Sequence, residues 1–354
     1  MHPNNRIMIA GNWSVPYYEP SLAAGFEKLG WEVRPFRVTE YLGSNVASRI
    51  EKKLLLGPQI LRLNQDLKSA VCRHRPAIVL LFKPIYFLPS TIEEIKNAGD
   101  TILITFNNDN PYEDGDRFKL WRHYHQLIRF CDINCFARPS DLVSAVAEHV
   151  PNPHWIKFWY IHGVHQRPQQ SDQEFCNDVI FAGHYEPDGR AETIEYLLQA
   201  GVNLRLFGSE WQRASKNEVL SSQQIRVLHG EDYIQAIAGA KIGLVFLSHR
   251  NRDQYTIRCF EIPACGTMMI APRTPVLQSL YDEDCEAVFF ESREELLDKI
   301  RFYLVHDDTR SRIALAGHRR CLSGKNSNID RAAEILDTAN QLLPGLALAS
   351  EQCR

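Results

Sequence analysis

Short runs of β-branched and aliphatic residues alternate with helix-forming stretches along most of the chain. In the first half this pattern predicts helices at 21–30, 51–74 and 92–99. It predicts strands at 6–11, 31–36, 77–83, 101–111 (the last running into a polar loop), 131–137 and 155–160. Strands that alternate with helices are typical of βαβ units, which build parallel sheets.

The alternation restarts after residues 166–174, a polar stretch with one Pro and no periodicity that predicts a linker. The second series predicts strands near 177–182, 202–207, 241–248, 267–272 and 286–292 and helices at 191–201, 232–240, 258–266, 293–305 and 307–321. We therefore expect an α/β fold of two Rossmann-like, doubly wound domains that face a cleft.

The expected domains are residues 1–165 and 172–335, followed by a C-terminal helix and tail at 336–354. A helix predicted at 330–344 would cross back to the first domain. Two domains also suit a chain of 354 residues with 44% apolar and 23% charged residues.

Charge and cysteine content exclude several classes of protein. Lys and Arg number 40 against 43 Asp and Glu, for a net charge of −3 without a dense basic run, which argues against a nucleic-acid partner. One phosphorylated ligand stays possible, since an Arg and a few backbone N–H groups suffice to hold a diphosphate. The nine cysteines are scattered and never spaced as CxxC, which indicates a reducing cytoplasm. No apolar stretch approaches the ~20 residues of a membrane span.

The most informative segment is residues 247–272, where a strand ends in a polar loop and a helix begins near Thr256. This helix carries Arg258 and Glu261 and stops at Gly266, and Asp253 lies eight residues before Glu261. A carboxylate so placed can accept hydrogen bonds from ribose hydroxyls, while an Arg and a helix N-terminus neutralise a diphosphate. The alternative is an i, i+3 ion pair between Arg258 and Glu261 on a solvated helix face.

The run RCFEIPACGTMMIA and the residues 280–320 that follow it resemble the C-terminal domain of group 1 glycosyltransferases of the spore-maturation-protein type. The resemblance implies the glycosyltransferase B (GT-B) fold and a nucleotide-sugar donor as cosubstrate, with no cofactor and no metal. It also implies that Glu261 holds the donor ribose as the second acid of a Glu-x7-Glu pattern. Asp253 occupies the first position with a side chain one methylene shorter.

The resemblance extends backward over most of the second half. Gly183 would let the loop backbone approach the donor, Arg190 would reach its phosphates, and Gly208 ends the next strand. Tyr233 would lie beside the nucleobase. Ser248 and Thr256 complete the predicted donor-binding set. The alternatives are ordinary turn glycines and a surface Arg at a helix start.

The first half resembles the family loosely and would bind the acceptor. Gly11, Asn12 and Trp13 form a loop at the end of the first strand, where they could meet the sugar, although a Trp there is more often a core residue. Asn108 and Asp109 follow another strand, and Asp109 is the candidate for contacting acceptor hydroxyls or acting as base. Asx residues before Pro are also common turn formers.

Other constellations are set aside. His123 and His125 point away from each other on a helix, and Cys265 has no His in its motif. The chain has no GxGxxG and no P-loop, and NDN at 108–110 comes close to a DxD motif.

The sequence thus predicts a cytoplasmic, metal-independent glycosyltransferase. Peripheral contact with the inner face of the membrane stays open. Its acceptor would be a glycan, lipid-linked or other hydroxyl compound. A nonenzymatic nucleotide-sugar-binding module and a sugar-nucleotide epimerase of the same fold stay open as alternatives.

Overall fold

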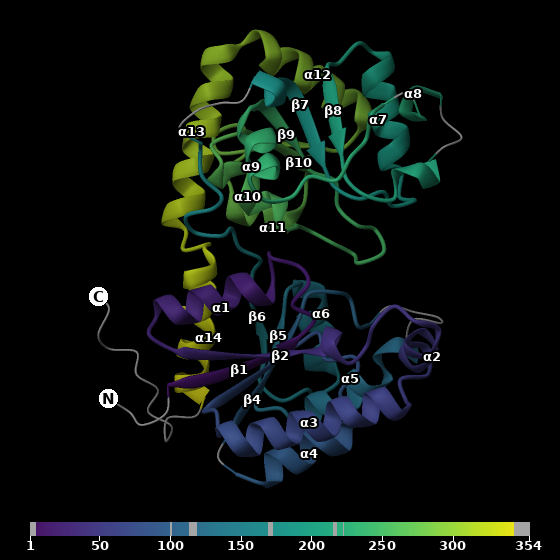
Figure 1. Ribbon diagram of the computed structural model, residues 1–354. Coiled ribbons are helices and arrows are strands. Elements are labelled where there is room, and N and C mark those ends of the chain that lie inside the picture. The colour runs from purple at the N-terminus through teal and green to yellow at the C-terminus, as the bar shows by residue number, and fades with distance from the viewer. Residues whose placement is uncertain are drawn as a thin grey trace. The chain divides into compact units, whose positions relative to one another are not determined.

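The computed structural model describes residues 5–99, 101–112, 119–168, 173–214, 218–221 and 223–342. The chain divides into two units: Met1–Lys157 with Asn328–Arg354 form unit 1, and Phe158–Ser327 form unit 2. Each unit consists of a parallel sheet with helices on both faces (Figure 1).

Unit 1 contains a parallel sheet with the order β2-β1-β3-β4-β5-β6. Its strands are β1 (Arg6–Gly11), β2 (Glu32–Arg37), β3 (Ile78–Phe82), β4 (Ile102–Asn107), β5 (Ile133–Phe136) and β6 (Pro153–Trp155). Every residue of β3 and β4 is buried, because helices cover both faces of the sheet centre.

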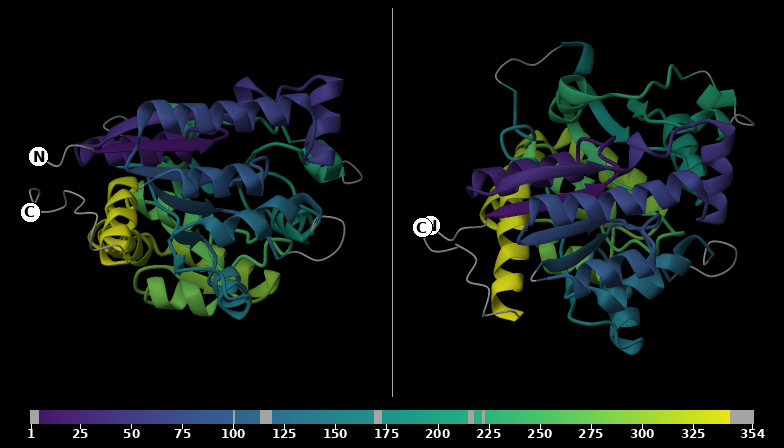
Figure 2. Two further views of the ribbon diagram at one scale, coloured as in Figure 1. Left: turned by 90° about the horizontal axis from the view of Figure 1, so that it is seen from below. Right: turned by 60° about the horizontal axis from the view of Figure 1, so that its bottom comes forward.

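The helices of unit 1 are α1 (Glu19–Lys28), α2 (Val46–Leu54), α3 (Pro58–His74), α4 (Pro89–Asn97), α5 (Arg122–Leu127), α6 (Pro139–Ala147) and α14 (Asn328–Leu342). One face of the sheet packs on α3 and α4 in a continuous apolar core. The other face carries α1 and α14 (Figures 1 and 2).

The last helix belongs to unit 1, as predicted for a helix that crosses back. Asn328 donates from Nδ2 to the Ser21 carbonyl at 2.7 Å. A Cβ at Gly25 would lie 2.5 Å from the backbone carbonyl oxygen of Asn328, so glycine permits the close approach of α1 and α14. The expected limit of the second domain at 335 therefore differs from the structure, which returns to unit 1 at Asn328. Residues 343–354 lie outside the described residues.

The predicted strand at 155–160 is wrong. β6 ends at Trp155, and residues 156–160 lie outside the strands. The Ile156 N–H donates to the Phe136 carbonyl of β5 at 3.0 Å, and Tyr160 forms an isolated bridge with Ser327. Most of these residues are buried, so their apolar character records burial and not a ladder. Unit 2 begins here, where Phe158 packs on the ring of Tyr255 with 5.5 Å between centroids. Of the predicted linker, residues 169–172 are outside the described part.

Unit 2 contains a second parallel sheet, with the order β11-β10-β9-β7-β8. Its strands are β7 (Asn177–Ala182), β8 (Leu204–Phe207), β9 (Ala240–Leu244), β10 (Met268–Pro272) and β11 (Val288–Phe290). The helices are α7 (Arg190–Gln199), α8 (Glu218–Ser221), α9 (Gly230–Ala238), α10 (Arg258–Ala264), α11 (Pro275–Leu280), α12 (Arg293–Val305) and α13 (Asp307–Ser323). α7 and α12 pack on one face, while α9, α10 and α13 contact strands β7, β9 and β10.

The strand order reverses between the first and third strands of each unit, β1 and β3 in unit 1 and β7 and β9 in unit 2. Ligands of open parallel sheets bind outside the carboxyl ends of the strands at such a switch point. Each unit therefore offers one place for a site. Within the described residues, no helix combines the length and the apolar character that crossing a bilayer would need.

Candidate functional site

At the switch point of unit 2, three side chains tie together the segments that follow β7 and β9. Ser248 donates from Oγ to Glu186 Oε2 at 2.6 Å, and the Asn251 backbone N–H donates to Ser248 Oγ at 3.2 Å. Arg258, the first residue of α10, donates from Nε to the Ala182 carbonyl at the end of β7. The predicted donor residues Ser248 and Arg258 therefore do lie at the switch point.

The glycines of this edge pack on each other. Gly208 has φ +141°, and a Cβ there would lie 1.9 Å from the Gly183 carbonyl oxygen. The Gly183 N–H donates to the Phe207 carbonyl, and its oxygen accepts from Trp211 Nε1 at 2.9 Å. Gly208 requires glycine because its backbone meets that of Gly183, whereas a Cβ at Gly183 would lie 2.6 Å from the Phe181 ring, whether or not a ligand approaches them.

Arg190 is buried at the start of α7 and is engaged by its own loop. Its Nε and Nη2 donate to the two carboxylate oxygens of Asp188 at 2.8 and 2.5 Å, and Nη1 donates to the His184 carbonyl at 2.8 Å. Such a bidentate pair fixes the loop between β7 and α7. The predicted contact of Arg190 with phosphates stays a prediction, and it would compete with this pair.

Glu186 adds a carboxylate to the same loop. Burial favours its neutral acid, but hydrogen bonds from His184 and Ser248 and the charge of Arg190 outweigh this effect and lower its pKa to about 2. The group is therefore ionised at neutral pH. The sequence did not predict Glu186 as a residue of the site.

Glu261 lies one turn along α10 and is only 1% exposed. Gly243 on β9 permits this helix to lie close to the sheet, since a Cβ there would meet Ile262 at 2.7 Å. Tyr233 on α9 donates from its hydroxyl to Glu261 Oε2 at 2.6 Å. His165 Nε2 lies 3.4 Å from Glu261 Oε1. These three side chains form the Glu261 cluster.

The hydrogen bonds of His165 fix its tautomer. Its Nδ1 accepts the Ile161 backbone N–H at 2.8 Å, so the ring proton is on Nε2, which faces Glu261. Burial lowers the pKa of His165 although the Glu261 charge opposes that effect. Glu261 thus receives hydrogen bonds from two donors of other segments, and its burial contradicts the alternative of a solvated helix face.

Asp253 and Thr256 lie in the loop that leads into α10. Both are half-buried, and the Asp253 N–H donates to the Ser248 carbonyl at 3.0 Å. The charges of Asp253 and Glu261 both act on the buried Cys259 thiol, whose pKa is raised to about 12 chiefly by burial. The helix starts at Arg258, two residues after the predicted start, and it ends as predicted before Gly266, which has φ +78°.

At the switch point of unit 1, a buried carboxylate shapes the loop after β1. Glu19 Oε1 accepts the Asn12 N–H at 2.7 Å, and a Cβ at Gly11 would collide with the same oxygen. Burial raises the pKa of Glu19, against the backbone N–H donors and the Lys83 charge. Trp13, with φ +65°, is half-buried and lies under the Arg37 guanidinium at 5.3 Å, so it is not a core residue.

The neighbouring strands β3 and β4 contribute Lys83 and Asp109 to this edge, and their side chains form an ion pair. Asn108 is buried, and its carbonyl accepts from Arg138 Nη1 at 2.5 Å. The structure therefore gathers the predicted residues of the first half at the carboxyl ends of β1 and β4. It gives Asp109, the candidate base, a lysine partner that the sequence did not reveal.

The side chains of the constellations set aside from the sequence lie in other surroundings. His125 Nε2 contacts the Pro111 carbonyl at 2.9 Å, and burial raises the pKa of Cys265. Among the described residues no group of His, Cys, Asp and Glu side chains is arranged to hold a metal ion.

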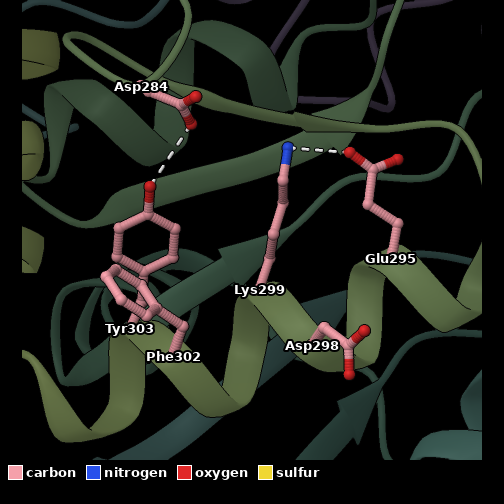
Figure 3. Close-up of a pocket in the computed structure, with 6 residues that line it drawn as sticks. All are labelled: Asp284, Glu295, Asp298, Lys299, Phe302 and Tyr303. Carbon is pink, nitrogen blue, oxygen red and sulfur yellow. Dashed lines mark hydrogen bonds and ion pairs between the residues drawn. The ribbon is translucent and has the colours of Figure 1, made fainter.

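A surface hollow of about 620 Å³ lies on α12, away from the predicted site residues (Figure 3). Within it Lys299 pairs with Glu295 at 2.9 Å, and the Tyr303 hydroxyl donates to Asp284 at 3.3 Å. These polar groups satisfy one another, and none of the predicted residues reaches the hollow.

Besides Glu186, three further residues of these sites could not be found from the sequence. His165 lies far from Glu261 along the chain, in a polar stretch without a motif, and Lys83 follows a buried strand without any marking pattern. Glu19 precedes Pro20 at a helix start, where an acidic residue is common. The one available signal was the rule that strand ends of a parallel sheet meet at one edge.

The comparisons with known proteins agree with the predicted class. A family model described as "Glycosyl transferase-like" matches residues 190–337, which is under half of the chain. No curated protein sequence matches significantly.

Solved structures resemble the chain over nearly its full length. Sucrose-phosphate synthase from Thermosynechococcus elongatus is 10% identical with a TM-score of 0.72, over 96% of this chain and 99% of that one. A glycosyltransferase from Rickettsia africae is 12% identical with a TM-score of 0.68, over 97% and 99%. HepE from Anabaena, solved with UDP-glucose, is 11% identical with a TM-score of 0.65, over 95% and 99%.

These findings support the prediction of a group 1 glycosyltransferase. The described chain has the GT-B fold of two Rossmann-like α/β domains, and residues 190–337 match a glycosyltransferase-like family.

Proposed function

We propose that this chain transfers a sugar from a nucleotide-diphosphate sugar to a hydroxyl of a glycan, lipid-linked or other acceptor, as a group 1 glycosyltransferase of the spore-maturation-protein type. The family match over residues 190–337 and the GT-B fold support this proposal. Uracil is the first nucleobase to test, because HepE was solved with UDP-glucose and with UDP.

The observation that carries the proposal is the Glu261 cluster beside the switch point of unit 2. A carboxylate has about four acceptor positions, and Tyr233 and His165 occupy two of them. The other two could accept the two ribose hydroxyls of the donor. Because Glu261 is almost fully covered, the side chains around it must shift before a ribose reaches it.

Arg258 is the better candidate for the diphosphate, because Arg190 already binds Asp188. In the proposed reaction the acceptor oxygen attacks the anomeric carbon, and the bond from that carbon to the β-phosphate oxygen breaks. The acceptor proton passes to a base, for which Asp109 stays the candidate. The Arg258 guanidinium would stabilise the charge that develops on the departing nucleoside diphosphate. We propose that no divalent metal takes part, so transfer should persist in EDTA.

The test combines nucleotide binding with turnover. Calorimetry with UDP, GDP and dTDP should reveal one preferred nucleotide, and Glu261→Ala should weaken its binding at least about tenfold. The matched control is Glu294→Ala on α12, an exposed carboxylate in the same unit, which should bind like the wild type. Unchanged nucleotide affinity in Glu261→Ala would show that the ribose is held elsewhere.

Two alternatives are separated by the products. A putative UDP-N-acetylglucosamine 2-epimerase from Listeria monocytogenes shares the fold at 10% identity, with a TM-score of 0.57 over 97% of each chain. An epimerase would interconvert donor isomers without any acceptor. A nonenzymatic binding module would release no nucleotide from a panel of nucleotide sugars, with or without acceptor extracts.

A further inference from the structure

Helix α2 has its polar and apolar faces reversed. The side turned into unit 1 carries Ser48 and Glu51, which are 0% and 8% exposed. The side turned to solvent carries Val46, Ile50 and Leu54, which are 61%, 53% and 55% exposed. A helix on a water-facing surface normally buries its apolar side, so this arrangement requires an explanation other than folding in water.

The polar contacts beneath α2 fix its orientation. The Glu51 carboxylate accepts the backbone N–H groups of Gln59 and Ile60 at 2.8 and 3.2 Å, at the start of α3. Ser48 Oγ donates to Gln59 Oε1 at 2.5 Å. Turning the helix would leave a buried carboxylate and the first N–H groups of α3 without partners. The outward position of the apolar side chains is therefore set by the fold.

The exposed apolar side chains follow one another closely in the sequence, along the helix and just beyond it. Val46, Ile50 and Leu54 are spaced by four residues and share one side of α2, which precedes α3 in unit 1 (Figure 1). Leu56 and Leu61 follow and are also exposed. These five residues form the α2 apolar face. They are five of the thirteen exposed large hydrophobic residues in the described chain, and a concentration of this kind marks an interaction surface.

Positive charge accompanies the α2 apolar face. Residues 41–66 contain four basic and two acidic residues, although the whole chain has a net charge of −3. Of the acidic residues, Glu51 is buried and Asp66 pairs with Arg62 at 3.7 Å. Arg49 and Lys53 are exposed on α2 beside the apolar residues. Within the described part of the chain, Arg49 and Lys53 form no ion pair. The surface therefore combines aliphatic side chains with unneutralised cations.

We infer that the α2 apolar face docks unit 1 on an anionic phospholipid bilayer, with α2 lying in the plane of the interface. Aliphatic side chains would enter the boundary between headgroups and acyl chains, while Arg49 and Lys53 contact lipid phosphates. A second copy of the chain fits less well, because a two-fold contact would place these cations against their own copies. The inference stands on the surface alone and does not depend on the proposed transfer reaction.

The experiment is flotation of the full chain with vesicles of phosphatidylcholine alone and with 30% phosphatidylglycerol. We expect binding to the anionic vesicles that weakens as salt rises, since the Debye length falls from ~10 Å at 0.1 M to ~3 Å at 1 M. The double variant Ile50→Ser, Leu54→Ser should bind at least about tenfold more weakly. Arg49→Gln with Lys53→Gln should remove most of the preference for anionic lipid.

The matched control is Val143→Ser with Val146→Ser, two exposed valines on α6 of the same unit, which should bind like the wild type. Hydrogen exchange of the wild-type chain gives a test without substitutions, in which anionic vesicles should protect residues 46–61. Absence of vesicle binding or of this protection would overturn the inference. So would a concentration-dependent dimer that the Ile50 and Leu54 variant abolishes.

Discussion

Each unit places a carboxylate near its switch point, and the two carboxylates differ in burial and in the charge of their partners. Glu261 in unit 2 is buried and bonded to two neutral donors, Tyr233 and His165. Asp109 in unit 1 is 30% exposed and paired with the cation of Lys83. The first carboxylate is held in a fixed position by the core, whereas the second is partly exposed and paired with one flexible side chain.

This difference has consequences for energy and for chemistry. Removing a buried carboxylate leaves its donors without partners, which is costly, whereas an exposed ion pair contributes little. A fixed carboxylate suits the binding of ribose hydroxyls in a set geometry. A partly exposed carboxylate that is paired with a flexible lysine side chain can exchange a proton with an acceptor and can change its position to fit it. Substitutions of Glu261, of His165 and of the Asp109–Lys83 pair test this contrast by their effect on the free energy of unfolding.

The largest effect is expected for Glu261→Ala. Truncation leaves the Tyr233 hydroxyl and His165 Nε2 buried without an acceptor, so the free energy of unfolding should fall by about 2–4 kcal/mol. Chemical denaturation monitored by circular dichroism measures this change. Glu261→Gln keeps an acceptor oxygen for Tyr233 and should lose about half as much. Equal stability of the Ala variant and the wild type would mean that the cluster is not formed in solution.

An intermediate effect is expected for His165, and it depends on pH. The pKa of His165 in the folded chain lies below 6.5 because burial disfavours the charged ring. The unfolded chain therefore binds more protons below pH 6.5, and stability must fall as pH decreases through this range, by up to about 1.4 kcal/mol per pH unit. His165→Gln should remove this contribution.

The control uses the difference between the wild type and His165→Gln, since burial also lowers the pKa of His123 and His125. The two stability curves should converge as pH falls from 7 toward about 5. A Gln side chain can accept the Ile161 N–H and donate to Glu261, so it should keep most of the nucleotide affinity, whereas His165→Phe should lower it severalfold. Parallel curves would show that His165 does not titrate with folding.

Much of this contrast was visible in the sequence. The alternation of strands and helices predicted both sheets, and the stop at Gly266 follows from the left-handed backbone that ends a helix. Glu261 was predicted because it follows Arg258 by one helical turn at the end of a strand and loop. The placement of residues within one short segment follows from local geometry, which the sequence records directly.

The partners were not visible, because they come from distant segments. Tyr233 donates to Glu261, because α9 packs on β7 and β9 and α10 packs on β10 of the same sheet. Its expected place beside a nucleobase stays a prediction. Arg190 was expected at the phosphates, although Asp188 two residues earlier could have indicated its bidentate pair. The strand at 155–160 failed because a buried apolar run has no period that distinguishes a ladder from a covered loop.

The smallest effect on stability is expected for Asp109→Asn and for Lys83→Met. Both side chains are about one third exposed, so each substitution should change the free energy of unfolding by less than about 1 kcal/mol, and a double-mutant cycle should give a coupling of similar size. Nucleotide affinity should stay that of the wild type, since both residues lie in unit 1.

If Asp109 is the base, the Asn variant should still slow transfer about 10²–10⁴-fold. Single-turnover kinetics with a saturating donor separates the two effects. A coupling above about 2 kcal/mol would place Asp109 in surroundings as fixed as those of Glu261. A normal transfer rate would move the base to another residue, such as Glu19, on which the charge of Lys83 also acts.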